Sequence, residues 1–286
     1  MNQPHLQGKT PPGRINGDWA FGCSCSMPCF TPDLLPSDLV GTMIYNQQEA
    51  SFQVKKGPIF SNIILADEVN RSPAKVQSAL LEAMQEKQVT IGETTYQLDR
   101  PFLVLATQNP VDQEGTYPLP EAQVDRFMMK VHIDYPSKAD EMEVMRRMAN
   151  MHFVSEVNAV LSKEDIFAIR AQINDVKIAE PLENYIIDLV FATRFPEKYG
   201  LKDEAKYIQF GVSPRASINL NLASRAMAFM EGRDYVLPED IKAIAEDVLN
   251  HRIILNYEAE ADNVSTRDLV KIFLEKIPIN KSVTLK

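Results

Sequence analysis

The stretch Ile63-Ile64-Leu65-Ala66-Asp67-Glu68-Val69-Asn70-Arg71 decides the fold class of this chain. Its apolar residues show no polar alternation, which is typical of a strand covered on both faces of a parallel sheet. Ligands of open α/β sheets bind at the carboxyl ends of such strands. Adjacent strand residues point to opposite sides, so one carboxylate can hold Mg²⁺ through its water shell while the other orients an attacking water. An isolated Asp-Glu pair is more often a solvated acidic loop, so the flanking sequence has to decide.

A second apolar run, Phe102–Thr107, is followed by Gln108-Asn109-Pro110 and predicts a neighbouring parallel strand. The segment between the two strands has apolar residues at helical spacing, with Ser72 as N-cap and Pro73 as first helical residue. Such a βαβ unit has a right-handed crossover, which brings Asn109 to the same sheet edge as the two carboxylates. There an amide can bind a γ-phosphate oxygen or the attacking water. An Asx-type turn before Pro110 is an equally common role.

Several further motifs flank these strands: Phe30–Asp38, Gly57–Phe60, Leu80–Glu86, Ala106–Pro110, Glu114–Gln123, Asp125–Phe127, Ser213–Ser217 and His251–Leu255. In combination they resemble the MoxR family of AAA+ ATPases, from residue 30 to about residue 280. The resemblance implies an α/β fold, a P-loop NTPase-like AAA+ core with a parallel sheet followed by an all-helical lid domain.

The resemblance also implies roles for individual residues. Asp67 and Glu68 would form the Walker B motif, with Asp67 as the Mg²⁺ ligand and Glu68 activating water. Asn109 would be sensor 1, Arg126 the arginine finger that reaches a neighbouring subunit's nucleotide, and Arg215 sensor 2 in the lid. The implied cofactors are ATP and Mg²⁺.

Two of these arginines can be judged on physical grounds. Ser213 and Pro214 predict a helix start, so Arg215 lies in the first turn, where the helix dipole disfavours a cation. A phosphate bound there would be favoured by the dipole and by the guanidinium, whereas the alternative is an arginine turned to solvent. For Arg126 the alternative is a local ion pair with Asp125, Glu121 or another acidic residue.

The composition limits the function classes. With 286 residues, of which 45% are hydrophobic, the chain can bury one large or two ordinary cores. A net charge of −9 argues against nucleic acid as the primary partner. No apolar stretch is long enough to span a membrane, and the N-terminus lacks a secretory core. A cytoplasmic location is therefore expected.

The domain organisation is expected to change twice along the chain. We expect an atypical N-terminal segment over 1–29, the AAA+ core over 30–136 and the lid over 137–286. Ser162 with Asp165 and Ser265 with Asp268 predict capping boxes, and Gly232 predicts a helix end. Lid helices are predicted near 138–152, 162–173, 181–194, 214–231, 238–250 and 265–277.

Two hairpins are predicted within the core. One has Met43–Tyr45 and Phe52–Val54 as its strands, and the other alternates from Val89 to Leu98 around Gly92-Glu93-Thr94. The family resemblance implies that they correspond to the helix-2 insert and the pre-sensor-1 hairpin, which can engage substrate proteins. Ordinary decoration of the sheet edge is an equally weighted alternative.

The first 29 residues depart from the family pattern. The phosphate-loop candidate is Gly8-Lys9-Thr10, but the motif spacing places Gln3 where the first glycine belongs, and Pro11-Pro12-Gly13 forbids the following helix. We therefore expect weak ATP binding and a sheet that lacks a central strand. The three cysteines, Cys23, Cys25 and Cys29, lack zinc-knuckle spacing, so free thiols are favoured over a metal site.

The sequence thus favours a MoxR-type ATPase that remodels or matures client proteins, in a ring oligomer for which six subunits are expected. Family resemblance suggests partners with von Willebrand factor A domains. The alternative is a ring subunit or scaffold of the same fold that is defective in nucleotide binding and does not hydrolyse ATP.

Overall fold

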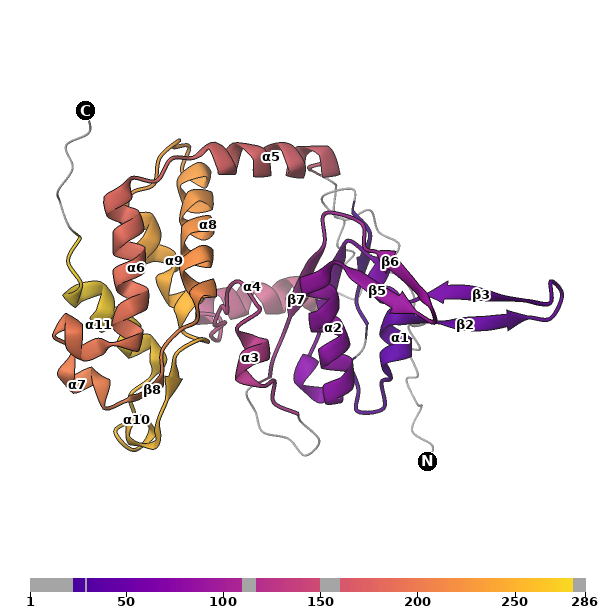
Figure 1. Cartoon of the computed structure of the whole chain (residues 1–286), viewed down its shortest axis with the longest axis horizontal. Coiled ribbons are helices and arrows are strands. Elements are labelled where there is room, and N and C mark those ends of the chain that lie inside the picture. Colours follow the sequence, from indigo (N-terminus) through magenta and orange to yellow (C-terminus); the bar gives the residue numbers. More distant parts are fainter. Residues whose placement is uncertain (1–22, 29, 110–116, 150–159, 280–286) are drawn as a thin grey trace. The chain divides into compact units, whose positions relative to one another are not determined.

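The two apolar runs form neighbouring parallel strands, as predicted. The computed structural model describes residues 23–28, 30–109, 117–149 and 160–279. Strand β4 (Ile63–Ala66) pairs in parallel with β7 (Leu103–Ala106), which is labelled in Figure 1, and on its other edge with β1 (Cys25–Ser26), which gives the order β1-β4-β7. Strand β1 lies within the range that the sequence assigns to a separate N-terminal segment. That segment therefore contributes to the sheet.

One face of this sheet forms the core of the first unit. Ile64, Ala66 and Val104 are buried in the same cluster as Val76 and Leu80 of α2 (Ala74–Glu86). On the opposite face of β7, Leu103 and Leu105 are 50% and 51% exposed. No strand in the described ranges pairs with the second edge of β7. The sequence of β7, apolar on both faces, is nevertheless that of a strand in the interior of a sheet.

The start of α2 differs from the sequence prediction. Pro73, rather than Ser72, is the N-cap, with extended backbone angles of −57° and 150°. The buried hydroxyl of Ser72 instead donates to the carbonyl of Val69, 2.9 Å away, within the 3₁₀ turn Val69–Arg71. The prediction of Ser72 as N-cap was wrong because this turn uses its hydroxyl.

A buried asparagine fixes the start of the three strands. The carbonyl oxygen of Asn62 accepts hydrogen bonds from the backbone N–H and the hydroxyl of Ser24, at 3.2 and 3.1 Å. Its amide nitrogen donates to the carbonyl of Pro101, 3.0 Å away. One side chain thus links the residues that lead into β1, β4 and β7, and it sets the register that aligns their carboxyl ends.

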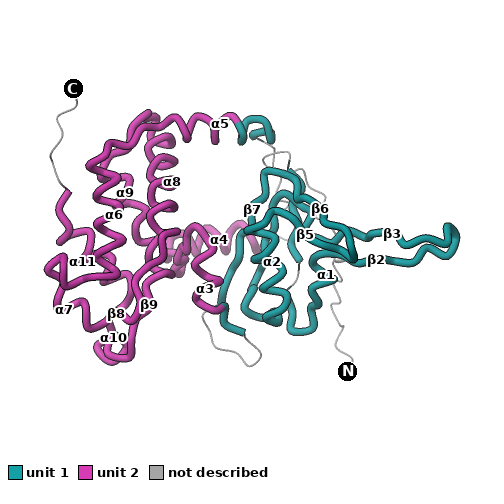
Figure 2. Tube along the Cα trace, viewed as in Figure 1, with its two compact units in different colours: residues 1–119, 156–167 teal, residues 120–155, 168–286 magenta. Residues whose placement is uncertain are grey.

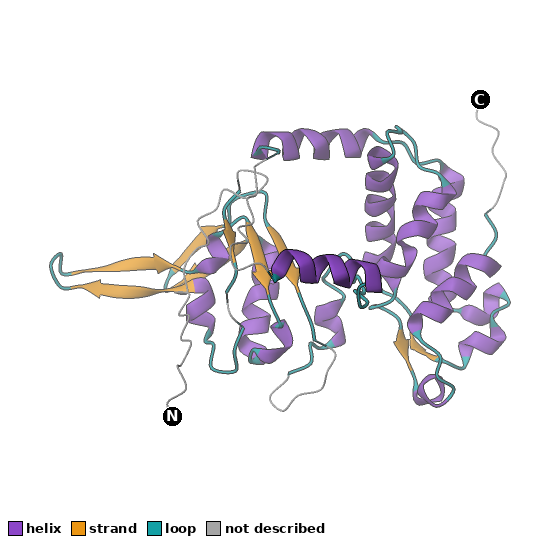
Figure 3. Ribbon diagram, turned by 180° about the vertical axis from the view of Figure 1, so that it is seen from behind, coloured by secondary structure: helices purple, strands orange, loops and turns teal. Residues whose placement is uncertain are grey.

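Both predicted hairpins are present in the first unit. Strands β2 (Gly41–Asn46) and β3 (Ser51–Lys56) form one, and β5 (Gln88–Ile91) and β6 (Thr94–Gln97) form the other (Figure 3). A short helix, α1 (Pro36–Val40), precedes the first hairpin, and the 3₁₀ turn Pro58–Phe60 follows it.

The remaining elements are mainly helical: α3 (Glu121–Val124), α4 (Lys138–Met148), α5 (Lys163–Asp175), α6 (Glu180–Arg194), α7 (Lys202–Ala205), α8 (Pro214–Met230), α9 (Pro238–Leu249), α10 (Tyr257–Ala261) and α11 (Thr266–Lys276), with the 3₁₀ turn Pro196–Tyr199. These elements confirm the predicted helices. The Ser162–Asp165 and Ser265–Asp268 capping boxes are also present. Gly232 has a φ of 73° just after α8, as expected for a helix end. A two-stranded pair, β8 (Ile208–Phe210) with β9 (Ile254–Leu255), was not predicted, because strands of two or three residues show no readable periodicity.

Contacts divide the chain into two units (Figure 2). The first comprises residues 1–119 and 156–167, and the second comprises 120–155 and 168–286. The second unit thus begins before residue 137, where the sequence predicts the lid. The backbone explains the difference: Lys130 donates to the carbonyl of Asp247 at 2.8 Å, which ties its segment to the helical part. In the portion of the chain that the structure describes, no helix is long and apolar enough to cross a membrane.

Candidate functional site

Thr107 joins the carboxyl ends of β4 and β7. Its hydroxyl donates to Oδ1 of Asp67 at 2.6 Å and accepts from the backbone N–H of Glu68 at 2.8 Å. Its own backbone N–H donates to the carbonyl of Ala66, and its carbonyl accepts from the N–H of Val69, both at 3.0 Å. These bonds fix the backbone that carries both carboxylates, and Asp67 itself is exposed.

Glu68 leaves the strand geometry that the sequence suggests. Its φ and ψ are both 51°, the left-handed region that residues other than glycine seldom adopt. Oε2 of Glu68 lies 2.9 Å from Nε of Arg71, and Oε1 accepts from the amide of Asn109 at 3.4 Å. The separation of the two carboxylates therefore comes from this backbone turn as well as from strand alternation. A left-handed residue costs about 1 to 3 kcal/mol, which the surrounding hydrogen bonds have to offset.

The buried side-chain amide of Gln77 stabilises the loops at this edge of the sheet. Nε2 of Gln77 donates to the carbonyls of Ser72 and Tyr117, at 3.0 and 2.9 Å. The N–H of Tyr117 donates to the carbonyl of Asn70 at 2.6 Å, and the Asn70 side chain donates to the carbonyl of Asn109 at 3.4 Å. Asp67, Glu68 and Asn109 are thus brought together at one edge, as the sequence predicts.

The donor atoms at this edge fit Mg²⁺. The ion keeps several waters and takes one or two carboxylates together with substrate phosphates. Asp67 offers an exposed carboxylate oriented by Thr107. Within the described residues there is no cluster of three or more carboxylate, imidazole or thiolate groups that could enclose a metal. A site with so few protein ligands suits an ion whose other ligands are water and phosphate.

The proposed phosphate-loop residues Gly8, Lys9 and Thr10 lie outside the described residues, as does Cys29. Cys23 and Cys25 are free thiols. Burial raises the pKa of both thiols, so they are poor metal ligands and poor nucleophiles at neutral pH.

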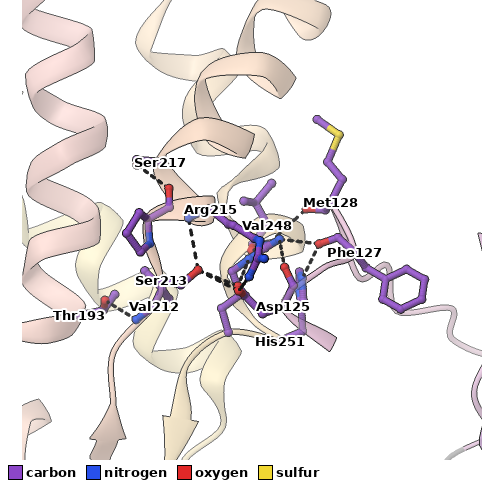
Figure 4. A network of polar contacts seen from close by, with 12 residues as sticks. Asp125, Phe127, Met128, Thr193, Val212, Ser213, Arg215, Ser217, Val248 and His251 are labelled. Atoms are coloured by element: carbon purple, nitrogen blue, oxygen red, sulfur yellow. Dashed lines mark hydrogen bonds and ion pairs between the residues drawn. The ribbon is translucent and has the colours of Figure 1, made fainter. Parts of the chain in front are cut away.

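In the second unit, Arg215 lies beside the Asp125 carboxylate (Figure 4), which it shares with Arg252. Nη1 of Arg215 lies 2.8 Å from Oδ2 of Asp125, and Nε of Arg252 lies 3.0 Å from Oδ1. The Ser213 hydroxyl is 2.9 Å from both carboxylate oxygens and caps α8 by accepting from the N–H of Arg215. Ser213 and Pro214 thus start the helix as predicted. Arg215 is half-exposed and is not simply turned to solvent.

Hydrogen bonds from a buried arginine fix the backbone around Arg126. Arg252, whose side chain is fully buried, donates to the carbonyls of Asp125, Phe127 and Met128. The Arg126 side chain itself is exposed. The alternative of a local ion pair with Asp125 is not what the structure shows, because the Asp125 carboxylate binds Arg215 and Arg252 instead.

This environment shifts the pKa values of Asp125 and His251. Burial would raise the pKa of Asp125, but hydrogen bonds from Arg215 and Ser213 and the charge of Arg252 lower it below its usual value. Burial, together with the charge of Arg252, lowers the pKa of His251 to about 4. Nε2 of His251 lies 3.2 Å from the carbonyl of Phe127, so the neutral ring donates there.

Sequence reasoning assigns no role to Thr107, Arg71, Asp125 or Arg252. A hydroxyl directly after β7 and two residues before Asn109 could have indicated Thr107. Arg252 lies inside the His251–Leu255 motif, which carries the family resemblance but indicates no role for this side chain. Its function depends on a partner 127 positions away, which no local pattern reveals.

The chain is similar to known ATPases over most of its length. A model described as the ATPase family associated with various cellular activities (AAA) matches residues 19–129, and an AAA lid domain matches residues 201–272. Chaperone MoxR1 of Mycobacterium tuberculosis is 44% identical over 87% of this chain, which spans 66% of that protein. Protein YeaC of Bacillus subtilis is 43% identical over 88% of this chain and 77% of its own length.

A solved structure agrees with these relatives. The crystal structure of a Cytophaga hutchinsonii protein described as a putative ATPase superimposes with a TM-score of 0.86 and 67% sequence identity. The match covers 92% of this chain and 79% of that one. The fold is therefore an AAA+ ATPase domain with its lid, and the chain belongs to the MoxR family of AAA+ ATPases.

Proposed function

We propose that the chain binds and hydrolyses ATP and uses the energy to remodel or mature client proteins. The observation that carries this proposal is the group of Asp67, Glu68, Thr107 and Asn109 at the carboxyl edge of a parallel sheet. Open α/β sheets bind ligands at this edge. Family membership and the chaperone name of the Mycobacterium tuberculosis relative support the same reading.

Each residue has a definite task in this proposal. Asp67, oriented by Thr107, would hold Mg²⁺, which when bound neutralises charge on the phosphates. Glu68 would accept a proton from the attacking water, and the Asn109 amide would position that water. Arg215 would neutralise charge on the transferring phosphoryl group from the lid, and Arg126 from a neighbouring subunit.

The proposal extends to assembly and partners. A finger acting on a neighbour requires a ring, for which we propose six subunits in the cytoplasm. Clients with von Willebrand factor A domains remain part of the proposal. At the hairpin, the rings of Tyr45 and Phe52 contact each other in a tilted arrangement with centroids 5.2 Å apart, and the two residues are 51% and 64% exposed. Exposed aromatic pairs of this kind support contact with another protein.

The N-terminal segment favours a second candidate, a ring subunit or scaffold that does not hydrolyse ATP. Gly8-Lys9-Thr10 lacks the glycine spacing that directs backbone N–H groups at a phosphate, and the sequence Pro11-Pro12-Gly13 disfavours the helix that should follow. Losing several charge-assisted hydrogen bonds, each worth roughly 1.5 to 3 kcal/mol, would weaken ATP affinity by several orders of magnitude.

Turnover at millimolar MgATP separates the two functions. The parent chain is expected to release phosphate, and Glu68→Gln is expected to abolish release while leaving nucleotide binding intact. Asp67→Asn should also weaken the Mg²⁺-dependent part of binding. Glu86→Gln, at an exposed position of α2, is the matched control and should behave like the parent. Parental turnover in Glu68→Gln would refute the assignment, and an inactive parent that still assembles would favour the scaffold.

A further inference from the structure

Asp125 lies at the centre of a polar network that includes Arg215 (Figure 4) and Arg252, and it directly precedes Arg126 in the chain. Its side chain is 14% exposed and faces a fully buried guanidinium, that of Arg252, on one side. On the other side it faces the half-exposed guanidinium of Arg215. The carboxylate therefore joins a rigid interior group to one that meets solvent.

The interior side of this network fixes the chain around Arg126. Arg252 binds the Asp125 carboxylate and the carbonyls of residues 125, 127 and 128. Farther along, Lys130 is held through both of its backbone groups: its N–H donates to the carbonyl of Asp247 at 2.8 Å, and its carbonyl accepts from the Asn250 amide at 3.0 Å. The backbone on each side of Arg126 is thus anchored while its side chain is exposed.

The solvent side of the network orients Arg215. Of the three guanidinium nitrogens of Arg215, the Asp125 carboxylate accepts a hydrogen bond from Nη1 alone. No described residue forms a hydrogen bond with Nη2 or Nε of Arg215. A guanidinium can bind an anion through two parallel N–H groups. Asp125 therefore fixes the direction of this side chain and leaves donors available for a phosphate.

We infer that Asp125 is a positioning residue: it sets Arg215 directly and sets the segment of Arg126 through Arg252, so that one carboxylate places both arginines. This inference rests on the proposed function for what the arginines bind, but the placement itself can be tested without nucleotide. A simpler possibility is that Asp125 only stabilises the fold, and a matched variant can distinguish the two.

Asp240 provides the matched control. Its side chain is 6% exposed and pairs with Arg233 at 2.6 and 2.8 Å, in the same unit. It also accepts from the N–H of Leu237 at the start of α9, at 2.7 Å. Asp240→Asn thus breaks a comparable aspartate–arginine pair but touches neither Arg215 nor Arg126.

The test labels arginines in the full chain with phenylglyoxal and maps the adducts by mass spectrometry. In Asp125→Asn we expect Arg215 to react about fivefold faster, the ratio that corresponds to losing an ion pair of about 1 kcal/mol. Hydrogen exchange should also accelerate at residues 127–130. Asp240→Asn should change neither readout, and Asp125→Glu should restore part of the Arg215 protection because it keeps the charge.

Unchanged labelling of Arg215 in Asp125→Asn, or equal changes in Asp240→Asn, would overturn the inference. If Asp125→Asn does not fold, Asp125→Glu is compared with Asp240→Asn: a selective change at Arg215 and at residues 127–130 supports it, and no such change overturns it. A separate arm adds MgATP to the parent chain, where absent protection of Arg215 counts against the proposed function alone.

Discussion

Arg252→Met is the substitution from which we expect the largest loss of stability. Methionine retains an unbranched apolar stem but removes every donor of the guanidinium. In the native chain those donors meet the Asp125 carboxylate and the backbone carbonyls of Asp125, Phe127, Met128 and Val248. The variant leaves these acceptors in a buried place without their partner.

The expected magnitude follows from burial. Breaking a buried ion pair by removing one partner costs about 3 to 5 kcal/mol, because an uncompensated charge stays inside. Asp125 keeps Arg215 and Ser213, which reduces the cost, whereas the orphaned carbonyls add about 1 to 3 kcal/mol each without simple additivity. We expect a loss of about 3 to 5 kcal/mol in the free energy of unfolding of the second unit, a large share of the usual 5 to 15 kcal/mol.

Urea unfolding followed by circular dichroism at 222 nm measures this loss, since most helices belong to the second unit. Arg215→Met is the control, because the Arg215 side chain is 48% exposed and Asp125 keeps its buried partner Arg252, so this variant should cost clearly less. Adding Asp125→Asn to Arg252→Met should recover at most about 1 kcal/mol, because the carboxylate that has lost Arg252 still pairs with Arg215. A loss below about 1 kcal/mol in Arg252→Met would refute the role of the buried pair.

Three further predictions concern assembly, pH and nucleotide. Arg126→Ala should lose hydrolysis but regain it in mixtures with Glu68→Gln, because each subunit supplies what its neighbour lacks; a protein that stays monomeric with and without nucleotide would rule this out. His251 has a pKa of about 4 in the folded chain against 6.5 ordinarily, so the unfolded state binds the proton first as the pH falls. Stability should therefore be complete above pH 6.5 and drop by about 3 kcal/mol as the pH approaches 4, and urea midpoints should show that His251→Phe flattens this slope. Finally, titration with a fluorescent ATP analogue and Mg²⁺ should reveal weak binding, whereas micromolar binding that Lys9→Ala destroys would show that Gly8-Lys9-Thr10 works as a phosphate loop.

The elements that the sequence predicted well are those with local signals. The helix that became α8 had a capping serine, a proline at its first position and a long apolar pattern, and all three are read from adjacent residues. The strands β4 and β7 were equally clear because continuous apolar runs end abruptly in polar residues. The placement of Asp67, Glu68 and Asn109 at one edge followed from parallel topology alone.

The features that the sequence did not predict depend on distant partners or on unusual backbone. Glu68 adopts a left-handed conformation that only the contacts of Thr107 and Arg71 explain. Asp125 was weighed only as a neighbour of Arg126, whereas its partners are 90 and 127 positions away. Ser72 is a residue type that favours helix N-caps, but its hydroxyl donates to the carbonyl of Val69 in the preceding 3₁₀ turn instead.

The uncovered edge of β7 has a consequence for handling the protein. Strands at the edge of a sheet normally carry lysine, proline or a bulge that prevents pairing with other chains. β7 has the sequence Leu-Val-Leu-Ala, and its second edge offers unpaired N–H and C=O groups beside two half-exposed leucines in the described portion of the chain. Such an edge promotes precipitation at high concentration. We therefore expect solubility, more than melting temperature, to limit the yield of this chain, and Leu103→Lys with Leu105→Lys to raise that yield.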